Sequence, residues 1–525
     1  MSLPPFLSRV HNAAGPLLGG IAESALAEVL RETTLTLEID DREAADRGHR
    51  ASFLFAVNLG ARLYPRLSIA APPELATAAA ELARAINAGC ELGAATGRTL
   101  TLTWCGGEPT ADRVTVAADA WNVRVDHGEP SAGPAEPPAA MAAAALGIGA
   151  LFRSLFAPHV AHPRTAAEPF ALNLVTLGPP AETPETPAQV ELGVVHLAGC
   201  GAVGQSAAAV LAQLPVRGTL VAVDHDPLDE GNLQRYLLAL AADVGAAKPA
   251  LIARAFEDHE LEVVPVPTRW GEDEHTAPGR ETVLSALDSK QGRIELQAGL
   301  PRELFNAWTQ PVDVGVSRHQ RFGEDPCLAC LAWPRHARPN ETKLIADALG
   351  EHELRVGIYA MLGVPVGAPL PADQIKGSLR LDVPSDAGAW AERSLLDDLV
   401  AHRGLPGEPF AAFKGVGIRA LYRDVVCAGM LIEHVGARDP EVSVPLAHQS
   451  ALAGVLLATW LFVDRVPALR ELRPAAAQAR YNVLRGGGEQ IWPRERGRQA
   501  RCLCSDPDFR DAYAARWTLP TASAA

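Results

Sequence analysis

The stretch ELGVVHLAGCGAVGQSAAAVLAQL, residues Glu191–Leu214, decides the fold of this chain. It begins with a short apolar run typical of a buried strand, passes through a glycine-rich loop and continues as an alanine-rich helix from Gln205. Gly199, Gly201 and Gly204 permit a tight turn, and the unpaired N–H groups at the start of the helix can bind phosphate. The order strand, glycine loop, helix therefore predicts a Rossmann-like nucleotide-binding domain.

The residues that follow continue the alternation of strands and helices. Thr219–Asp224 predicts a second strand that ends in a carboxylate, which can accept hydrogen bonds from ribose hydroxyls. A helix is predicted over Ala247–His259, and Glu262–Val266 and Thr282–Leu287 predict further strands. Such alternation predicts a parallel sheet with right-handed crossovers. The loop and Asp224 alone fit an ordinary NAD- or FAD-binding domain equally well.

The first 177 residues have the same rhythm without a glycine-rich loop after any strand. The alternation predicts an α/β domain that lacks nucleotide-binding residues, and the Pro-rich stretch Gly178–Ala188 predicts a linker. The predicted strands are Ser52–Gly60, Arg98–Trp104, Arg113–Ala118 and Phe170–Thr176, and the predicted helices are Glu74–Ala88 and Ala139–Phe156.

Composition excludes two classes of partner. The chain has 525 residues, with 47 Lys and Arg against 62 Asp and Glu, a formal charge of −15, so we expect no nucleic-acid partner. No apolar run reaches the length of a bilayer span, and Ala139–Leu151 and Ala451–Val463 are predicted to be buried helices. No secretory signal is visible at the N-terminus, so we expect a cytoplasmic protein that contacts no membrane.

Cationic residues after the second strand favour ATP over NAD. Asn232, Arg235 and Lys248 follow that strand, at the mouth of the same crevice, and Asp288 ends the strand that begins at Thr282. A dehydrogenase keeps its pyrophosphate and needs one cation or none there. A site that splits ATP must neutralise a triphosphate and a departing pyrophosphate with Arg, Lys and a metal ion. Asp288 is the carboxylate placed to hold Mg²⁺.

With these residues the segment resembles the adenylating domain of the ubiquitin-activating-enzyme superfamily, which includes MoeB and ThiF. The strong resemblance runs from Leu192 to Trp333. It implies that Asp224 holds the ATP ribose, that the Asn, Arg and Lys hold the phosphates and that the last Asp positions Mg²⁺. One departure is Ser289, where the superfamily usually has Asn. The matching positions are Gly199, Gly201, Gly204, Asp224, Asp226, Asn232, Arg235, Lys248 and Asp288.

Two close cysteine pairs extend the resemblance. Cys327 and Cys330 resemble the element that supplies half of a structural zinc site in MoeB- and ThiF-like proteins, and Cys502 and Cys504 stand where the second half is expected. Four thiolates form a closed tetrahedral site without an open catalytic position. The second pair has the spacing CxC instead of CxxC. It therefore stays open whether another residue replaces Cys502 or Cys504 as a zinc ligand. The alternative is two buried cysteine pairs without metal.

Cys427 lies in the chain between the two zinc halves. The resemblance implies a catalytic cysteine after the adenylating core, which takes the activated carbonyl as a thioester. Arg419 and Arg423 would favour its thiolate, whereas the apolar run VVCAGML equally fits a buried core cysteine. Cys90 and Cys105 are interpreted as core residues, and Cys200 as a small residue of the loop.

The predicted fold class is α/β, with two Rossmann-like adenylation folds, a helical catalytic-cysteine region and a structural zinc site. The superfamily needs two pseudo-symmetric folds, so an inactive first half would form an internal pseudo-dimer, in a chain that is a monomer or a dimer. The expected parts are residues 1–177, a degenerate adenylation-like domain; 178–190, a linker; 191–335, the active domain; 336–440, the catalytic-cysteine region; and 441–525, which completes the adenylation domain and zinc site.

The resemblance implies ATP-dependent activation of the C-terminal carboxylate of a ubiquitin-like β-grasp protein. The acyl group would pass through a thioester to a protein like a ubiquitin-conjugating enzyme, with ATP, Mg²⁺ and structural Zn²⁺ as cofactors. Bacterial ubiquitin-like conjugation systems, some linked to phage defence, use activating enzymes of about this architecture. Three alternatives stay open: a sulfur-carrier adenylyltransferase without thioester transfer, an NAD(P)-dependent oxidoreductase, and a non-enzymatic scaffold that binds a ubiquitin-like protein.

Overall fold

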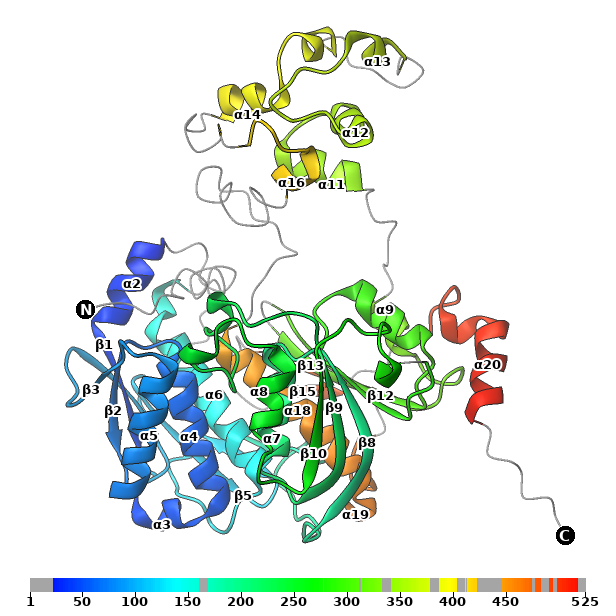
Figure 1. The fold of residues 1–525 in the computed structure, drawn as a ribbon. Helices are drawn as coiled ribbons and strands as arrows, with labels where there is room; N and C mark the ends of the chain where they lie inside the picture. The colour runs from blue at the N-terminus through cyan, green and yellow to red at the C-terminus, as the bar shows by residue number, and fades with distance from the viewer. Residues whose placement is uncertain are drawn as a thin grey trace, which may run out of the picture. The chain divides into compact units, whose positions relative to one another are not determined.

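The computed structural model divides the chain into two compact units (Figure 1). Unit 1 comprises Met1–Trp333 and Val444–Ala525, and unit 2 comprises Pro334–Ser443. The structure describes residues 22–159, 169–276, 278–310, 313–332, 341–377, 387–403, 411, 413–422, 446–474, 477–482, 491–493 and 498–517.

Unit 1 contains two sheets, and the glycine-rich loop belongs to the second. This sheet has eight strands in the order β10-β9-β8-β11-β12-β13-β14-β15. The strands from β10 to β12 are parallel, and β13, β14 and β15 add as antiparallel neighbours. The strand order reverses between β8 and β11, which is the point where ligands bind in open α/β sheets. The strands are β8 (Val190–Ala198), β9 (Val216–Val223), β10 (Leu261–Val266), β11 (Thr282–Ser285), β12 (Glu303–Thr309), β13 (Asp313–His319), β14 (Gln478–Asn482) and β15 (Ile491–Pro493).

The first sheet repeats the order of the first seven strands of the second sheet and has no counterpart of β15. Its order is β3-β2-β1-β4-β5-β6-β7, with five parallel strands and then two antiparallel ones. When the strands are numbered along the chain within each half, both sheets have the order 3-2-1-4-5-6-7. This repeat confirms the predicted fold class. The strands are β1 (Thr33–Glu38), β2 (Arg66–Ala70), β3 (Glu91–Leu92), β4 (Arg98–Thr103), β5 (Arg113–Asp119), β6 (Asn122–Val125) and β7 (Phe170–Asn173).

The helices of the two halves correspond as well. The first strand of each sheet leads to a helix, α4 (Arg47–Ala61) or α7 (Ala202–Leu211), and a helix of 19 residues precedes the seventh strand, α6 (Pro137–Leu155) or α18 (Ala447–Arg465). Each long helix packs on the helix and the fifth strand of its own half, and the two long helices contact each other. The two halves thus share one hydrophobic core.

The long helices are core helices, as predicted for the runs Ala139–Leu151 and Ala451–Val463. Within the described residues, α6 is the one helix that is long and apolar enough to cross a membrane, and 83% of its apolar window is buried inside the protein. Nearly every residue of α18 is buried too. Burial against two sheets explains their composition without a lipid environment.

The remaining described α-helices of unit 1 connect the strands or flank the sheets. They are α2 (Glu23–Arg31), α3 (Asp41–Ala45), α5 (Pro73–Ile86), α8 (Lys248–Arg254), α9 (Lys290–Ala298), α10 (Leu328–Ala332), α19 (Pro467–Arg470) and α20 (Pro507–Trp517).

One predicted element of the first half is wrong. The apolar run Ser52–Gly60 is not a strand but most of helix α4. The helix packs against α5, α6 and the sheet, so apolar residues occupy most of its faces and the polar positions that mark helical periodicity are missing. The predicted helix over Ala247–His259 is shorter, because α8 ends at Arg254, and Phe170–Thr176 is a strand only as far as Asn173.

Unit 2 is a helical unit with its own core. In the chain it is inserted between β13 and α18, at the point where the first half has only a loop between β6 and α6. Arg355 is buried in it and pairs with Asp398 at 2.8 Å, while its guanidinium lies 5.8 Å from the ring centroid of Trp390. Its described α-helices are α11 (Glu341–Leu349), α12 (Glu353–Leu362), α13 (Ala372–Gly377), α14 (Leu395–Arg403) and α16 (Ile418–Leu421).

Candidate active site and metal centre

The glycine-rich loop lies at the reversal point of the second sheet, and its glycines are required by close packing. A Cβ atom on Gly199, whose φ is 95°, would lie 3.0 Å from the carbonyl oxygen of Ala286 just after β11. A Cβ atom on Gly204 would lie 2.1 Å from the carbonyl oxygen of Gly199. The N-cap of α7 is Gly201, and no side chain caps the helix. The N–H groups of its first turn are thus available to an anion.

Asp224 directly follows β9 and fixes the loop against that strand. Its Oδ2 accepts a hydrogen bond from the backbone N–H of Cys200 at 2.8 Å, and its Oδ1 accepts one from the N–H of Asp226 at 3.0 Å. The carboxylate therefore lies beside the glycine loop at the carboxyl end of the second strand. A ribose hydroxyl is bound at this position in dinucleotide-binding folds.

Lys248 begins helix α8 and points at the same carboxylates. Its side chain is 7% exposed, and its Nζ lies 3.0 Å from Asp226 Oδ2 and 4.0 Å from Asp224 Oδ1. Burial lowers the pKa of Lys248, but Tyr236 and the two carboxylates outweigh burial and raise that pKa above the ordinary lysine value. The lysine is thus held as a cation at the base of the site, where a phosphate would meet it.

Asn232 and Arg235 lie on the segment between β9 and α8. The Oδ1 of Asn232 accepts a hydrogen bond from the N–H of Asp229 at 3.1 Å, which orients the Asn232 amide. Arg235 and Lys248 lie 5.4 and 5.6 Å from the ring centroid of Tyr236, within reach of a cation–π interaction. The structure therefore brings together the two predicted cations around one ring.

Tyr236 is a residue that the sequence analysis missed. Its hydroxyl would lie 3.3 Å from a Cβ atom on Gly201, so the ring lies against the glycine loop and organises the cations beside it. The sequence signal for Tyr236 is weak, because it is a single tyrosine directly after Arg235 and belongs to no motif with a recognisable spacing.

Asp288 is exposed and follows β11. Strand β11 is the neighbour of β8, which leads into the glycine-rich loop. In the part of the chain that the structure describes, Asp288 belongs to no group of three close metal ligands, whereas Asp224, His225 and Asp226 form one. The role of Asp288 in holding Mg²⁺ therefore stays a prediction; proteins hold this ion with one or two carboxylates together with substrate phosphates. Ser289, the departure from the superfamily pattern, caps helix α9, because its side chain accepts a hydrogen bond from the N–H of Gly292 at 3.0 Å.

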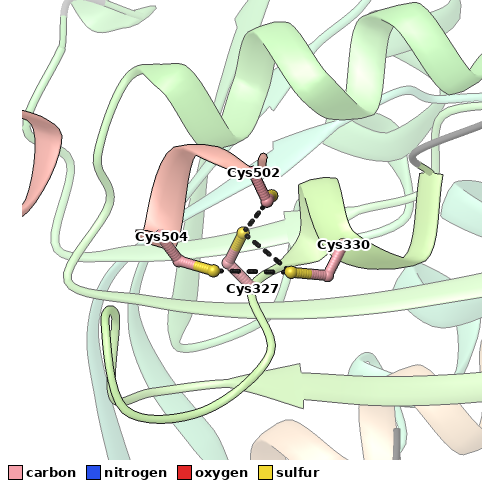
Figure 2. Close-up of side chains that lie close together, drawn as sticks. All are labelled: Cys327, Cys330, Cys502 and Cys504. Carbon is pink, nitrogen blue, oxygen red and sulfur yellow. Dashed lines mark hydrogen bonds between the residues drawn. The ribbon is translucent and has the colours of Figure 1, made fainter. Parts of the chain in front are cut away.

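The four paired cysteines form one cluster (Figure 2). The Sγ of Cys327 lies 3.5 Å from that of Cys502 and 3.9 Å from that of Cys330, and Cys330 lies 3.4 Å from Cys504. These distances exceed a disulfide bond of about 2.05 Å. They match the separation of about 3.8 Å that tetrahedral Zn–S bonds of about 2.3 Å impose. Both thiols of the CxC pair lie close to the first pair, and all four cysteines are buried, so the cluster fits a closed structural zinc site.

The other cysteines differ from one another in exposure. Cys427 lies outside the described residues, so its predicted role as a nucleophile stays a prediction. Cys90 and Cys200 are buried, and burial raises the pKa of the Cys200 thiol well above its ordinary value. Cys105 is exposed just after β4, so its interpretation as a core residue is wrong. Its neighbours Gly106 and Gly107 both have positive φ, so the chain makes a tight turn directly after Cys105.

Two family models match the chain, one in each half. Residues 188–361 match the ThiF family, and residues 34–167 match the BilD N-terminal domain. A protein of Sinorhizobium fredii (strain NBRC 101917 / NGR234), y4jF, which is described as uncharacterized, is 31% identical over 534 residues. That alignment covers 98% of this chain and 97% of the relative.

Solved structures of E. coli MccB are more distant. The structure titled as MccB with ATP is 14% identical with a TM-score of 0.32, and covers 59% of this chain and 65% of its own. The structure of MccB without a named ligand is 14% identical with a TM-score of 0.34, and covers 60% and 66%.

The ThiF match covers the glycine-rich loop, Asp224, Lys248 and the first cysteine pair. The family and the site together support an adenylyltransferase-type enzyme that binds ATP and uses it to adenylate a substrate carboxylate. The match, the strand order and the loop geometry lead to one conclusion: residues 188–361 of this chain form a ThiF family domain, which places the chain in the ThiF-like superfamily.

Proposed function

We propose that the protein activates the C-terminal carboxylate of a ubiquitin-like β-grasp protein and passes it to a protein like a ubiquitin-conjugating enzyme. The observation that carries this proposal is the repeated topology of unit 1. One half has a glycine-rich loop, and the other half has the same strand order without one. A chain with this design holds an active and an inactive adenylation fold in one core and needs no second copy to complete the pair.

The proposed first step is adenylation. A carboxylate oxygen of the substrate attacks the α-phosphate of ATP, the bond between the α- and β-phosphates breaks, and pyrophosphate leaves. Lys248 and Arg235 would neutralise phosphate charge, and the N–H groups of α7 would bind phosphate oxygens. Asp288 would hold the Mg²⁺ ion that ATP brings, which would neutralise further phosphate charge. The product is an acyl-adenylate, whose leaving group is AMP.

The proposed second step is a thioester transfer. The thiolate of Cys427 attacks the acyl carbon of the adenylate and releases AMP. The insertion of unit 2 between β13 and α18, with Cys427 in its sequence, favours this step, because the corresponding place in the first half has only a loop. A second candidate function, adenylation of a sulfur-carrier protein, shares the first step and lacks the second.

ATP–pyrophosphate exchange tests the first step. The full chain would be incubated with Mg·ATP, labelled pyrophosphate and candidate β-grasp proteins encoded near its gene. We expect exchange that depends on one of these proteins, and a loss of about 10²–10³-fold in Asp288→Ala and Arg235→Ala. Glu262→Ala is the matched control, because this carboxylate is exposed on the edge strand β10. Exchange in Asp288→Ala close to that of the wild type contradicts the assignment.

A further inference from the structure

Arg62, in the half without a phosphate loop, is fully buried and has an unusual set of partners. It ends helix α4 and is 0% exposed, yet no described carboxylate lies within ion-pair distance of it. Burial without a counter-charge lowers its pKa to about 9. A cation in such a place is retained only if hydrogen bonds satisfy its guanidinium.

Those hydrogen bonds reach into the other half. Arg62 donates to the backbone carbonyls of Leu233, Leu237 (3.2 Å) and Ala239 (2.8 Å). Asn58, one turn earlier on α4, donates to the same Leu237 carbonyl at 2.9 Å and accepts from Arg62 Nε at 2.8 Å. We call Asn58 and Arg62 the clamp.

The clamped segment, Leu233–Ala239, forms neither a helix nor a strand. It contains Arg235 and Tyr236, and its conformation is fixed by tertiary hydrogen bonds. From the other side, the buried Gln205 accepts a hydrogen bond from the N–H of Leu238 at 3.1 Å. Its amide donates to the carbonyl of Cys200 in the glycine loop at 3.2 Å. Contacts therefore run from the first half through the segment to the phosphate loop.

We propose that Arg62 and Asn58 are positioning residues of the ATP site. They hold segment Leu233–Ala239 so that Arg235 faces the phosphates, although neither of them touches the nucleotide. Without Arg62, the carbonyls of Leu233 and Ala239 lose their donor, the carbonyl of Leu237 keeps only Asn58, and the segment loosens. The inference rests on the proposed function and gives the half without a phosphate loop a role in ATP binding.

Affinity of the full chain for the non-hydrolysable analogue Mg·AMPPCP, measured by calorimetry, tests the clamp. We expect Arg62→Met to bind about 10-fold more weakly, and Arg62→Lys to recover part of the loss, because an ammonium group satisfies some of the carbonyls. Asn58→Ala, a milder change that is less disruptive to folding, should weaken binding about 3-fold. Arg66→Met is the matched control, because Arg66 lies in the same half and pairs with Glu91 on a strand edge. It should stay within about 2-fold of the wild type.

Two further measurements separate positioning from a merely structural role. In a double-mutant cycle, Arg62→Met should weaken Mg·AMPPCP binding by less than about 3-fold in a chain that already carries Arg235→Met. Both changes act on the same contact, between Arg235 and the phosphates. Losses that multiply independently overturn the proposal. Hydrogen exchange without nucleotide should speed up in residues 228–240 of Arg62→Met and stay unchanged elsewhere. Wild-type protein that binds no analogue contradicts the proposed function itself. A wild type that binds, with Arg62→Met binding equally well, contradicts only the clamp.

Discussion

The two halves of unit 1 have one topology and opposite chemistry at the same place. After the first strand of the second sheet, helix α7 starts at Gly201 without a side-chain cap. After the first strand of the first sheet, the carboxylates of Asp40 and Asp46 accept hydrogen bonds from the N–H groups that start α3 and α4, at 2.8 and 2.9 Å. Carboxylates therefore cap the helix starts of the first half, and we expect this half to bind no phosphate there.

The space behind these caps is also filled. His49 lies 2.9 Å from the carboxylate of Glu43 through its Nδ1, and its Nε2 lies 3.0 Å from both the Ser131 hydroxyl and the Ala118 carbonyl oxygen. The side chains of Glu43 and His49 are 3% and 2% exposed. A buried, hydrogen-bonded group thus lies where the second half has its open loop, and we expect this half to bind no nucleotide.

The cations and carboxylates of the second half have no counterparts either. The second strand of the first sheet is followed by Ala71 where the other half has Asp224, and the next helix starts at Pro73 where the other half has Lys248. The comparison teaches that strand order alone does not make an ATP site. The predicted site combines the glycine loop, the uncapped helix and the charged residues that follow strands β9 and β11.

The largest expected effect is the loss of the covalent adduct in Cys427→Ala. It tests whether the nucleophile lies in unit 2 and not in the first half. Cys427→Ala should leave ATP–pyrophosphate exchange intact and eliminate the thiol-sensitive covalent adduct with the β-grasp protein, because no thiolate is left to take the acyl group. Gel electrophoresis with and without reducing agent measures the adduct.

Cys105→Ala is the matched control for that experiment, because Cys105 is the exposed cysteine among the described residues and belongs to the first half. Loss of the adduct in Cys105→Ala, with the adduct kept in Cys427→Ala, would move the nucleophile to the first half. A wild type that exchanges pyrophosphate without any adduct favours the sulfur-carrier function.

The zinc cluster should stabilise the second half alone. Elemental analysis is expected to find about one zinc ion per chain, and Cys327→Ser should lose it, because three thiolates leave the tetrahedral site incomplete. Since metal binding contributes directly to folding, the variant should unfold at a lower temperature or precipitate. Cys90→Ser, a buried cysteine of the first half, should keep the zinc. A folded wild type without metal refutes the site.

The smallest expected effect tests whether the caps of the first half are purely structural. Asp46→Ala removes the side chain that caps α4 and should lower the free energy of unfolding by about 1 kcal/mol. Urea denaturation measures this change. Affinity for Mg·AMPPCP should not change, because the capped helix does not bind phosphate. A fall in affinity as large as that of an ATP-site variant would mean that the first half binds nucleotide.

The active half was largely predictable because its signals are local. The strand, loop and helix of Glu191–Leu214 are consecutive in the chain, and the spacing from Asp224 to Lys248 could be compared with a family pattern. The CxC pair, Cys502 and Cys504, also lies in the chain where the second half of the zinc site is expected. Local spacing fixes such features before any tertiary contact is known.

The rest depends on contacts between distant parts of the chain. Arg62 and Leu233 are separated by 171 residues, and nothing in either local sequence marks the contact. The topological repeat was not visible as a sequence repeat, because the same strand order is built from different residues. The run Ser52–Gly60 was predicted as a strand, since burial on most faces of α4 removed the period that identifies a helix.

The number and place of bound nucleotides test the central claim that one chain holds one open and one closed half. Calorimetry with Mg·AMPPCP should give one site per chain, and a crystal structure of the complex should place it against Gly199–Gly204 and Lys248. Lys248→Met should weaken this binding strongly, whereas Lys414→Met, an exposed lysine of unit 2, should not. Two nucleotides per chain, or one bound at the start of α4, would contradict the account.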